Sequence, residues 1–464
     1  MTLYLEYEVI YMDQTDEKQE MSAKYVYMTQ TPVKKLICKL AVPTIVSMLV
    51  TGIYNSADTF FVGKISTEAT AAVGIVFSVM AIIQAIGFMC GQGSGNYLAR
   101  MLGANDTKQA NEVASTGFAL SLIIGTLIAL VGIFLVEPIS DMLGATETTL
   151  TDTKNYMRII LLGAPFMTGQ FVINNQLRFQ GSAIYAMFGL LAGAIANIAL
   201  DPLFIFVFDL GVSGAALATV SGQIISFIVL MIGSKQGVNI HIRFKNIKIN
   251  KHYILEIING GIPSLFRQGL AALATIMLNK IAGEFGGDAA IAGMSVATRT
   301  LMLVSSALIG FGQGYQPVCS FNYGANLKKR VKQGYFFCLK YGTLFLIVVA
   351  AACFVFAPQI VSYFRDDPDV IAIGSKALRF QAVTLPLMSG IVMTNMMLQS
   401  IGAGIKASIS SSARSGIFFI PLLFAFSSLF GLTGVECAQA AADVCSMVLA
   451  IPFAYSELKK MNDE

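Results

Sequence analysis

The sequence has little charge for its length. Only 12% of its 464 residues are charged, whereas a soluble domain carries about 25%. Hydrophobic residues make up 55% of the chain, and the mean hydropathy is +0.68. Such a chain cannot cover a water-facing surface. Its apolar runs of about 20 residues or more predict an all-α integral membrane protein, because a β-barrel would have short alternating segments.

Residue types suited to catalysis or metal binding are also scarce. The only two histidines, His241 and His252, lie in one basic loop, and the seven cysteines have no CxxC spacing. There is no HExxH motif and no GxxxxGK[ST] motif. We therefore predict that the protein is not an enzyme and has no metal site, no cofactor and no nucleotide. The net charge of +4 gives no indication of a nucleic-acid partner. Transport would have to use a gradient of H⁺ or Na⁺.

The first 30 residues are polar and acidic. They contain no apolar core of the length found in signal peptides. This pattern predicts a flexible cytoplasmic tail over residues 1–30 and no cleavable signal peptide. It leaves open whether Met1, Met21 or Met28 is the true start.

Twelve apolar runs are long enough to cross a membrane. They lie near residues 36–62, 71–98, 114–136, 157–179, 184–208, 211–233, 253–283, 289–317, 334–357, 378–402, 415–430 and 431–455. Alternate loops (99–113, 178–183, 234–252, 321–333 and 403–414) hold 14 Lys and Arg, and the loops on the other side hold 4. The positive-inside rule places the loops with more Lys and Arg, and both termini, in the cytoplasm. We therefore expect the chain to span the inner membrane of a bacterial cell.

The two halves of the chain resemble each other at a displacement of about 220 residues. The run Gly91-Gln92-Gly93 followed by Gly103-Ala104-Asn105 recurs, at the same spacing, as Gly312-Gln313-Gly314 and Gly324-Ala325-Asn326. Each half has six spans, so the copies share one orientation and form parallel, pseudo-symmetric six-helix bundles. The predicted parts are an N-lobe (31–233), a basic linker (234–252), a C-lobe (253–457) and a cytoplasmic tail (458–464). Two such lobes suit alternating access. Gly-Gln-Gly inside a span favours close helix packing over phosphate binding.

Several motifs resemble the multidrug and toxic compound extrusion (MATE) transporters, in particular their MepA/DinF-like bacterial branch. They are Ala41-Val42-Pro43, Tyr54 with Asp58-Thr59-Phe60-Phe61-Val62-Gly63, Arg178-Phe179-Gln180-Gly181, and the stretches 193–206 and 211–219. The resemblance covers residues 31–458. It implies an exporter of organic, often cationic, compounds by antiport with H⁺ or Na⁺. It also implies that Tyr54 and Asn174 line a substrate cavity and that the first span, which contains Pro43, bends during transport. Pro43 and Pro202 each remove a backbone hydrogen bond, which allows either bending or a static kink.

The resemblance is incomplete at two acidic positions. The NorM-like branch has a glutamate in the seventh span and an aspartate in the tenth. Here the seventh span reads Ser264-Leu265-Phe266-Arg267-Gln268, and residues 378–402 contain no acid. The sequence therefore favours an ion-coupling site in the N-lobe over one at those two positions.

Two acidic residues inside N-lobe spans are the leading candidates for ion coupling. Counted along the helix from Lys39 to Asp58, and from Ala183 to Asp201, both acids sit about 27–28 Å above the inner boundary. Asn197 lies one turn below Asp201, and Thr219 reaches a similar level. Two carboxylates at the same depth repel each other, which favours a proton on one of them. The same oxygen atoms are also suitable ligands for Na⁺. Alternatively, Asp201 caps a helix broken by Pro202, and Asp58 lies at the interface near Lys64.

A third polar group lies in the last span. Glu436, Gln439 and Asp443 share one helical face. They either line the C-lobe side of the substrate cavity or form a structural network with Arg267, Lys280 or Arg299.

These observations favour a monomeric secondary transporter, surrounded by membrane lipid, that exports small organic compounds. An alternative within the same superfamily is a flippase or exporter of a lipid-linked saccharide or a metabolite. That activity would favour several basic residues in the cleft, and intramembrane Lys and Arg are few.

Overall fold

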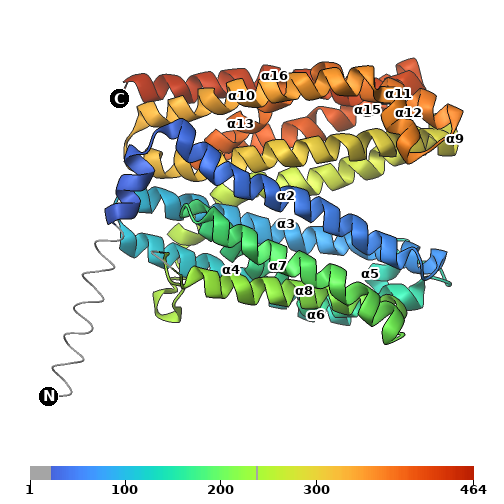
Figure 1. Ribbon diagram of the computed structural model, residues 1–464, viewed down its shortest axis with the longest axis horizontal. Helices are drawn as coiled ribbons and strands as arrows, with labels where there is room; N and C mark the ends of the chain where they lie inside the picture. Colours follow the sequence, from blue (N-terminus) through green and yellow to red (C-terminus); the bar gives the residue numbers. More distant parts are fainter. Residues whose placement is uncertain (1–21, 237–238, 464) are drawn as a thin grey trace.

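The computed structural model describes residues 22–236 and 239–463, and for residues 53–57, 59, 462 and 463 it describes the backbone alone. Every regular element in these residues is a helix, and most of the long helices run side by side (Figure 1). The first half contains α2 (Val33–Val62), α3 (Thr67–Gly103), α4 (Thr107–Phe134), α5 (Val136–Met142), α6 (Leu150–Phe179), α7 (Ala183–Pro202), η1 (Leu203–Val207) and α8 (Gly211–Ser234). The linker holds η2 (Phe244–Asn246). The second half contains α9 (Lys251–Gly324), α10 (Lys328–Val355), α11 (Ala357–Phe364), α12 (Pro368–Thr384), α13 (Leu387–Ser400), α14 (Gly404–Ser412), η3 (Ala413–Ile417), α15 (Phe419–Phe430) and α16 (Leu432–Asp463).

The long apolar helices make this a multi-pass membrane protein. In the described part of the chain, nine helices are long and apolar enough to cross a membrane, and the pair α12 and α13, bent by 58°, makes ten. α9 counts as one of these nine, but Gly287 has a positive φ of 60° and divides it into two arms. α2 is itself 30 residues long. α2 and the two arms of α9 lie where the sequence predicts the first, seventh and eighth of its twelve spans.

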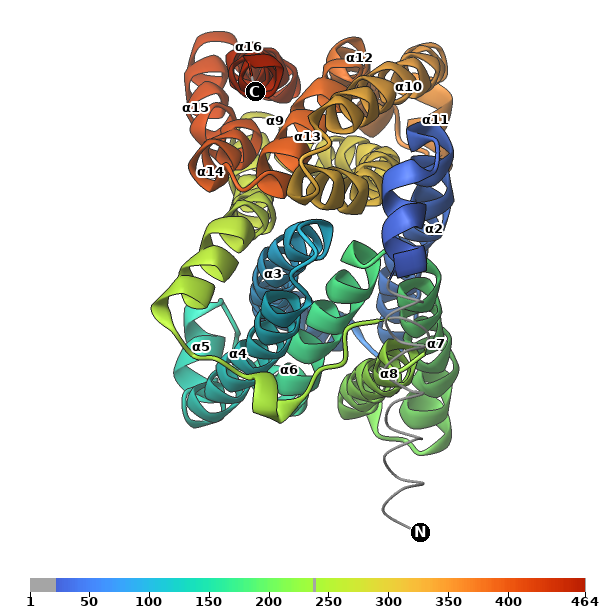
Figure 2. The same cartoon turned by 90° about the vertical axis from the view of Figure 1, so that its left-hand side faces the viewer.

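The two halves repeat the same internal contact. Asn174 on α6 donates to the backbone oxygen of Ala186 on α7 at 2.8 Å, and Asn395 on α13 donates to that of Ala407 on α14 at 2.7 Å. Both partners of the second bond occupy the positions that the repeat pairs with those of the first. Figure 2 shows α3–α8 and α10–α16 as two groups of helices, with α2 beside both. The repeat read from the sequence is thus a repeat of packing.

The halves meet where α3 and α9 end, at the end of the molecule that also holds the C-terminus (Figure 1). We call this end, which carries Lys245 and Lys329, the basic end. A methyl group on Gly103 would lie 2.0 Å from the backbone oxygen of Phe321, and one on Gly324 would lie 2.0 Å from that of Arg100. The two contacts are reciprocal, because the repeat pairs Gly324 with Gly103 and Phe321 with Arg100. The helices cross about the pseudo-two-fold axis, and only glycine fits at the crossing.

The repeated Gly-Gln-Gly motifs also pack the lobes together. A methyl group on Gly93 would lie 1.9 Å from the backbone oxygen of Ile257 on the first arm of α9. One on Gly314 would lie 2.4 Å from the Cα of Ala41 on α2. The predicted role in close helix packing is therefore confirmed.

The last residues before α2 differ from the predicted tail. Residues 22–30 form a helix, and the side chain of Met28 is fully buried. It lies beside Gly181 of the N-lobe, and its backbone oxygen accepts a hydrogen bond from Asn322 of the C-lobe at 3.2 Å. This segment therefore bridges both lobes at the basic end. The sequence of residues 1–30 is polar on average and does not predict this contact, because a single buried methionine supplies much of it.

The membrane orientation can be tested by labelling single cysteines in a cysteine-free background. Lys245 and Lys329 are exposed at the basic end, and Glu147 and Asp366 are exposed in loops of the opposite set. Cysteines at the first two positions are expected to react with an impermeant maleimide in everted vesicles, and those at the last two in intact cells. Labelling of positions 147 and 245 from the same side would contradict the topology.

Candidate functional site

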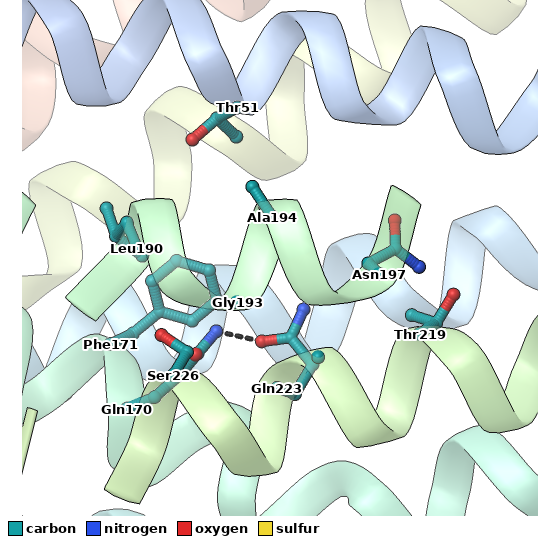
Figure 3. Close-up of a pocket in the computed structure, with 11 residues that line it drawn as sticks. Thr51, Gln170, Phe171, Leu190, Gly193, Ala194, Asn197, Thr219, Gln223 and Ser226 are labelled. Atoms are coloured by element: carbon teal, nitrogen blue, oxygen red, sulfur yellow. Dashed lines mark hydrogen bonds between the residues drawn. The ribbon is translucent and has the colours of Figure 1, made fainter. Parts of the chain in front are cut away.

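The N-lobe contains a small polar pocket between α2, α6, α7 and α8. Its volume is about 30 Å³, which is the space of one water molecule and too little for an organic compound. Figure 3 shows the side chains that surround it. The lining residues are Thr51, Gln170, Phe171, Leu190, Gly193, Ala194, Asn197, Thr219, Gly222, Gln223 and Ser226. Two of the four predicted coupling residues, Asn197 and Thr219, therefore lie in one pocket.

α7 carries two buried polar side chains one turn apart. Asn197 is 3% exposed and Asp201 is fully buried, and the polar side-chain atoms of both lack hydrogen-bond partners in the described structure. α7 lies close to α8 because a methyl group on Gly193 would lie 2.7 Å from the backbone oxygen of Gly222. The packing holds these unpaired groups against α8, where Thr219 lies. Buried polar groups without partners are costly and need an explanation.

Asp58 lies on α2, which packs against α7. Its Oδ1 is buried without a hydrogen-bond partner in the described structure. Neither this carboxylate nor that of Asp201 forms an ion pair with any Lys or Arg whose side chain the structure describes. Lys64, the cation nearest in sequence, instead lies over the ring of Phe60 at 4.5 Å. Nor does Asp201 cap α7. The alternative role of Asp201, capping or hydrogen-bonding its helix, therefore does not hold, while the interfacial position of Asp58 stays a prediction.

The floor of the pocket contains polar residues that the sequence analysis did not select. Gln170 on α6 donates to Gln223 on α8 (Figure 3), while the Oε1 of Gln170 and the Oγ of Ser226 have no partner in the described part of the chain. The sequence contains a pattern that predicts this set, because Thr219, Gln223 and Ser226 follow one another at helical spacing in an apolar span. Together these groups supply carboxylate, amide and hydroxyl oxygens, the ligands that hard cations and protonated water prefer.

The polar stripe of the last span has a different environment. Lys376 on α12 pairs with Glu436 at 2.8 Å, and Arg414 in η3 pairs with Asp443 at 2.7 Å. Gln439 donates to Asp443 at 2.9 Å. The stripe thus belongs to a network inside the C-lobe. Its cations are Lys376 and Arg414 and not Arg267, Lys280 or Arg299, because α12 and η3 pack against α16.

Comparison with known proteins gives the family. The MatE family model matches residues 43–203 and again residues 263–425. The chain belongs to the MatE family. The two matched segments start at equivalent positions of the two halves, as the repeat requires. A protein named multidrug export protein MepA, from Staphylococcus aureus (strain MSSA476), is 30% identical over 434 residues, 92% of this chain and 95% of the relative. MepA of Staphylococcus haemolyticus is 29% identical over 93% and 95%.

Solved MATE structures share the fold. A structure described as the outward-facing conformation of a multidrug resistance MATE family transporter superposes with a TM-score of 0.89 and 27% identity, over 95% of this chain and 99% of that one. The superposition covers both lobes of the chain. It supports the two-bundle architecture that the sequence of this MATE protein predicts.

The remaining residues that the MATE resemblance selected have mixed surroundings. The side chain of Tyr54 lies outside the described residues. Asn174 is 5% exposed and hydrogen-bonds the backbone of α7, so its amide is already engaged. Pro43 lies within α2, and Pro202 ends α7 where the π-helix η1 begins. The bending of these helices stays a prediction.

Replacing Asp443 by asparagine is expected to destabilise the protein. The change leaves the guanidinium of Arg414 without its counter-ion, and breaking such a pair costs about 3 kcal/mol when it is buried. Thermal unfolding of the purified protein should show a melting temperature lower by several degrees. Glu137→Gln, in an exposed pair with Lys154, is the matched control and should have little effect. An unchanged melting temperature with an altered choice of exported compound would instead place Asp443 in the cavity.

Proposed function

We propose that this MATE protein is a secondary active transporter that exports small organic compounds in exchange for H⁺ or Na⁺. The observation that carries the proposal is the set of buried carboxylate oxygens without partners in the described structure, both of Asp201 and the Oδ1 of Asp58, with a pocket of one-water size one turn along α7 from Asp201. Such a set binds a proton or a small cation because either one removes an uncompensated charge from the protein interior. The relatives named multidrug export protein support a broad range of exported compounds.

We place the protein in the inner membrane of a bacterium, as a monomer with both termini in the cytoplasm. The excess of Lys and Arg in alternate loops supports this orientation. In the described structure, the lobes close against each other at the basic end through Gly103 and Gly324. Alternating access then requires this contact to open toward the cytoplasm. No cofactor is needed, since the ion gradient supplies the driving force.

Efflux from everted vesicles tests the proposal. A fluorescent organic cation is added outside the everted vesicles, which is the cytoplasmic side of the membrane. A pH gradient and a Na⁺ gradient are then imposed separately. We expect one of the two gradients to drive accumulation in vesicles that contain the protein, and none in vesicles without it. A protein that responds to neither gradient is not an antiporter of this kind.

A further inference from the structure

A second pocket lies in the C-lobe, at the end of the molecule opposite the basic end. Its volume is about 460 Å³, which is within the range of pockets that bind organic compounds. One wall is the first part of the second arm of α9, and the other is the turn between α11 and α12 together with the start of α12 (Figure 1). The proposed ion coupling in the N-lobe does not involve this pocket.

Close helix packing places an apolar surface inside the pocket. A methyl group on Gly293 of α9 would lie 2.9 Å from the backbone nitrogen of Gly374 on α12. Beside this contact, Val296 on α9 and Val370 on α12 are buried in one apolar cluster with Val361 on α11. Val296 and Val370 also line the pocket. Its inner surface can therefore cover an apolar part of a ligand.

Two arginines line the pocket, one on each wall. Arg299 lies on α9, and Arg365 directly follows α11. Neither guanidinium forms a hydrogen bond or an ion pair with any residue that the structure describes. By contrast, Arg379 on α12, which does not line the pocket, donates to the backbone oxygen of Phe354 at 3.2 Å. The two pocket arginines thus keep their donors free for a ligand.

Arg299 lies in a predicted membrane span and not in a loop. It is twelve residues after Gly287, or about 18 Å along the helix. Its position shares a face of α9 with Gly310 and Gly314, where that helix meets α2. A methyl group on Gly310 would lie 2.6 Å from the Cα of Ile45 on α2. An arginine inside a span is costly and normally faces a hydrated cavity or a ligand path, and this one faces a pocket on the side of α2.

The carboxylates of the pocket do not pair with these arginines. Asp367 accepts hydrogen bonds from the backbone N–H groups of Asp369 at 3.0 Å and Val370 at 3.2 Å, so it caps α12. Asp288 is eleven residues before Arg299, or about 16 Å along the helix. Within the described structure, the pocket therefore presents two guanidinium groups without a counter-ion beside an apolar surface.

We propose that this pocket binds an organic anion, in which a phosphate or carboxylate group is joined to an apolar body. Arg299 and Arg365 bind the charged group, because a guanidinium donates two parallel N–H bonds to either anion. The apolar body lies against Val296 and Val370, and it covers the ring of Phe364, which is 48% exposed. A compound that fills the pocket contacts both walls. This inference goes beyond the proposed ion-coupled export and does not depend on it.

A tryptophan placed in the pocket can report binding at this site alone, because the chain contains no tryptophan. The full chain with Phe364→Trp is purified in a neutral detergent. The probes are hexyl phosphate, dioctanoyl phosphatidylglycerol and hexyltrimethylammonium, each added at constant ionic strength. Hexyl phosphate is expected to change the tryptophan fluorescence until the site is saturated, which gives a Kd.

Substitutions in this background show which side chains bind the anion. Arg299→Gln or Arg365→Gln should raise the Kd for hexyl phosphate about tenfold or more, because each change removes charge-assisted hydrogen bonds. Replacement of the same arginines by lysine should cause a smaller rise. Arg379→Gln, at an exposed position on α12 outside the pocket, is the matched control and should leave the Kd unchanged.

A second readout uses the chain with Phe364 in place. Hexyl phosphate at saturation should raise its melting temperature by about 3 °C, and the two glutamine variants should lose this rise. The variants should fold without ligand, since neither arginine has a partner to lose in the described structure.

The probes distinguish the possible ligands. Binding of hexyl phosphate that depends on both arginines supports a dissolved organic anion. Binding of dioctanoyl phosphatidylglycerol alone, with the same dependence, supports a lipid headgroup in the same site. Binding of hexyltrimethylammonium alone, lost in Asp288→Asn, would overturn the assignment to anions. No binding of either anion in both readouts, or equal affinities in the glutamine variants, would overturn the site. Because no gradient is used, failure of ion-coupled efflux would not affect these results.

Discussion

Replacing Gly103 by valine is expected to abolish transport by preventing closure at the basic end. A methyl group at this position would lie 2.0 Å from the backbone oxygen of Phe321. That atom belongs to a helix and cannot move aside as a side-chain end could. Overpacking of this kind costs about 1–3 kcal/mol or more, which shifts a two-state equilibrium by about 5–150-fold. The lobes should remain apart at the cytoplasmic side, and gradient-driven efflux from everted vesicles should be lost.

The pseudo-symmetry of the chain provides an independent repeat of this experiment. Gly324→Val should have the same effect, because its side chain would meet the backbone oxygen of Arg100 at the same distance. Gly74→Val on α3 is the matched control, since nothing lies within 4 Å of that position in the described structure. Spin labels at Lys108 and Lys329, which are exposed at the basic end on opposite lobes, should lie farther apart in both crossing variants than in the wild type. Normal efflux by folded Gly103→Val protein would mean that this contact is not required for the transport cycle.

The fold was largely predictable because it depends on features that a sequence displays directly. Long apolar runs require helices in a membrane, since each backbone polar group must be satisfied within its own segment. The Gly-Ala-Asn repeat also has a local explanation. The glycines allow the crossing, and Asn105 and Asn326 adopt left-handed φ values of 60° and 59° after the helix ends, a conformation that asparagine tolerates.

The N-lobe pocket was predictable in part. The common depth of Asp58 and Asp201 is predicted from helix length alone, and the structure places Asn197 and Thr219 in one pocket, one turn from Asp201. The contribution of Gln170 depends on which face of α6 meets α8. A helix with polar residues on several faces does not reveal that from its sequence.

Partners in the C-lobe and at the basic end could not be read from the sequence. Arg414 in the π-helix η3 reaches Asp443 on α16, 29 positions away, because the two spans pack together. The interaction of Arg178 with Gln313 joins residues 135 positions apart. Such pairs depend on how the lobes pack, and no spacing in the chain encodes them.

Replacing Asp58 or Asp201 by asparagine is expected to abolish ion-coupled efflux while the protein still folds. Asparagine keeps the size of the side chain and removes a buried charge that has no counter-ion in the described structure. Folding should therefore survive or improve. The coupling ion, however, loses the charge that binds it. Efflux from everted vesicles should fall to the level of vesicles without the protein in either single variant.

Substrate binding separates loss of coupling from loss of the substrate site. Ion and substrate are linked only through the two conformations that each of them favours. Detergent-solubilised Asp58→Asn and Asp201→Asn should therefore still bind a fluorescent cation. Their binding should no longer depend on pH if H⁺ is the coupling ion, or on Na⁺ concentration if Na⁺ is. Asp141→Asn, in an exposed position outside the pocket, is the control and should keep both efflux and ion dependence. Normal efflux by both pocket variants would remove the N-lobe from the coupling mechanism and direct attention to Glu436 and Asp443.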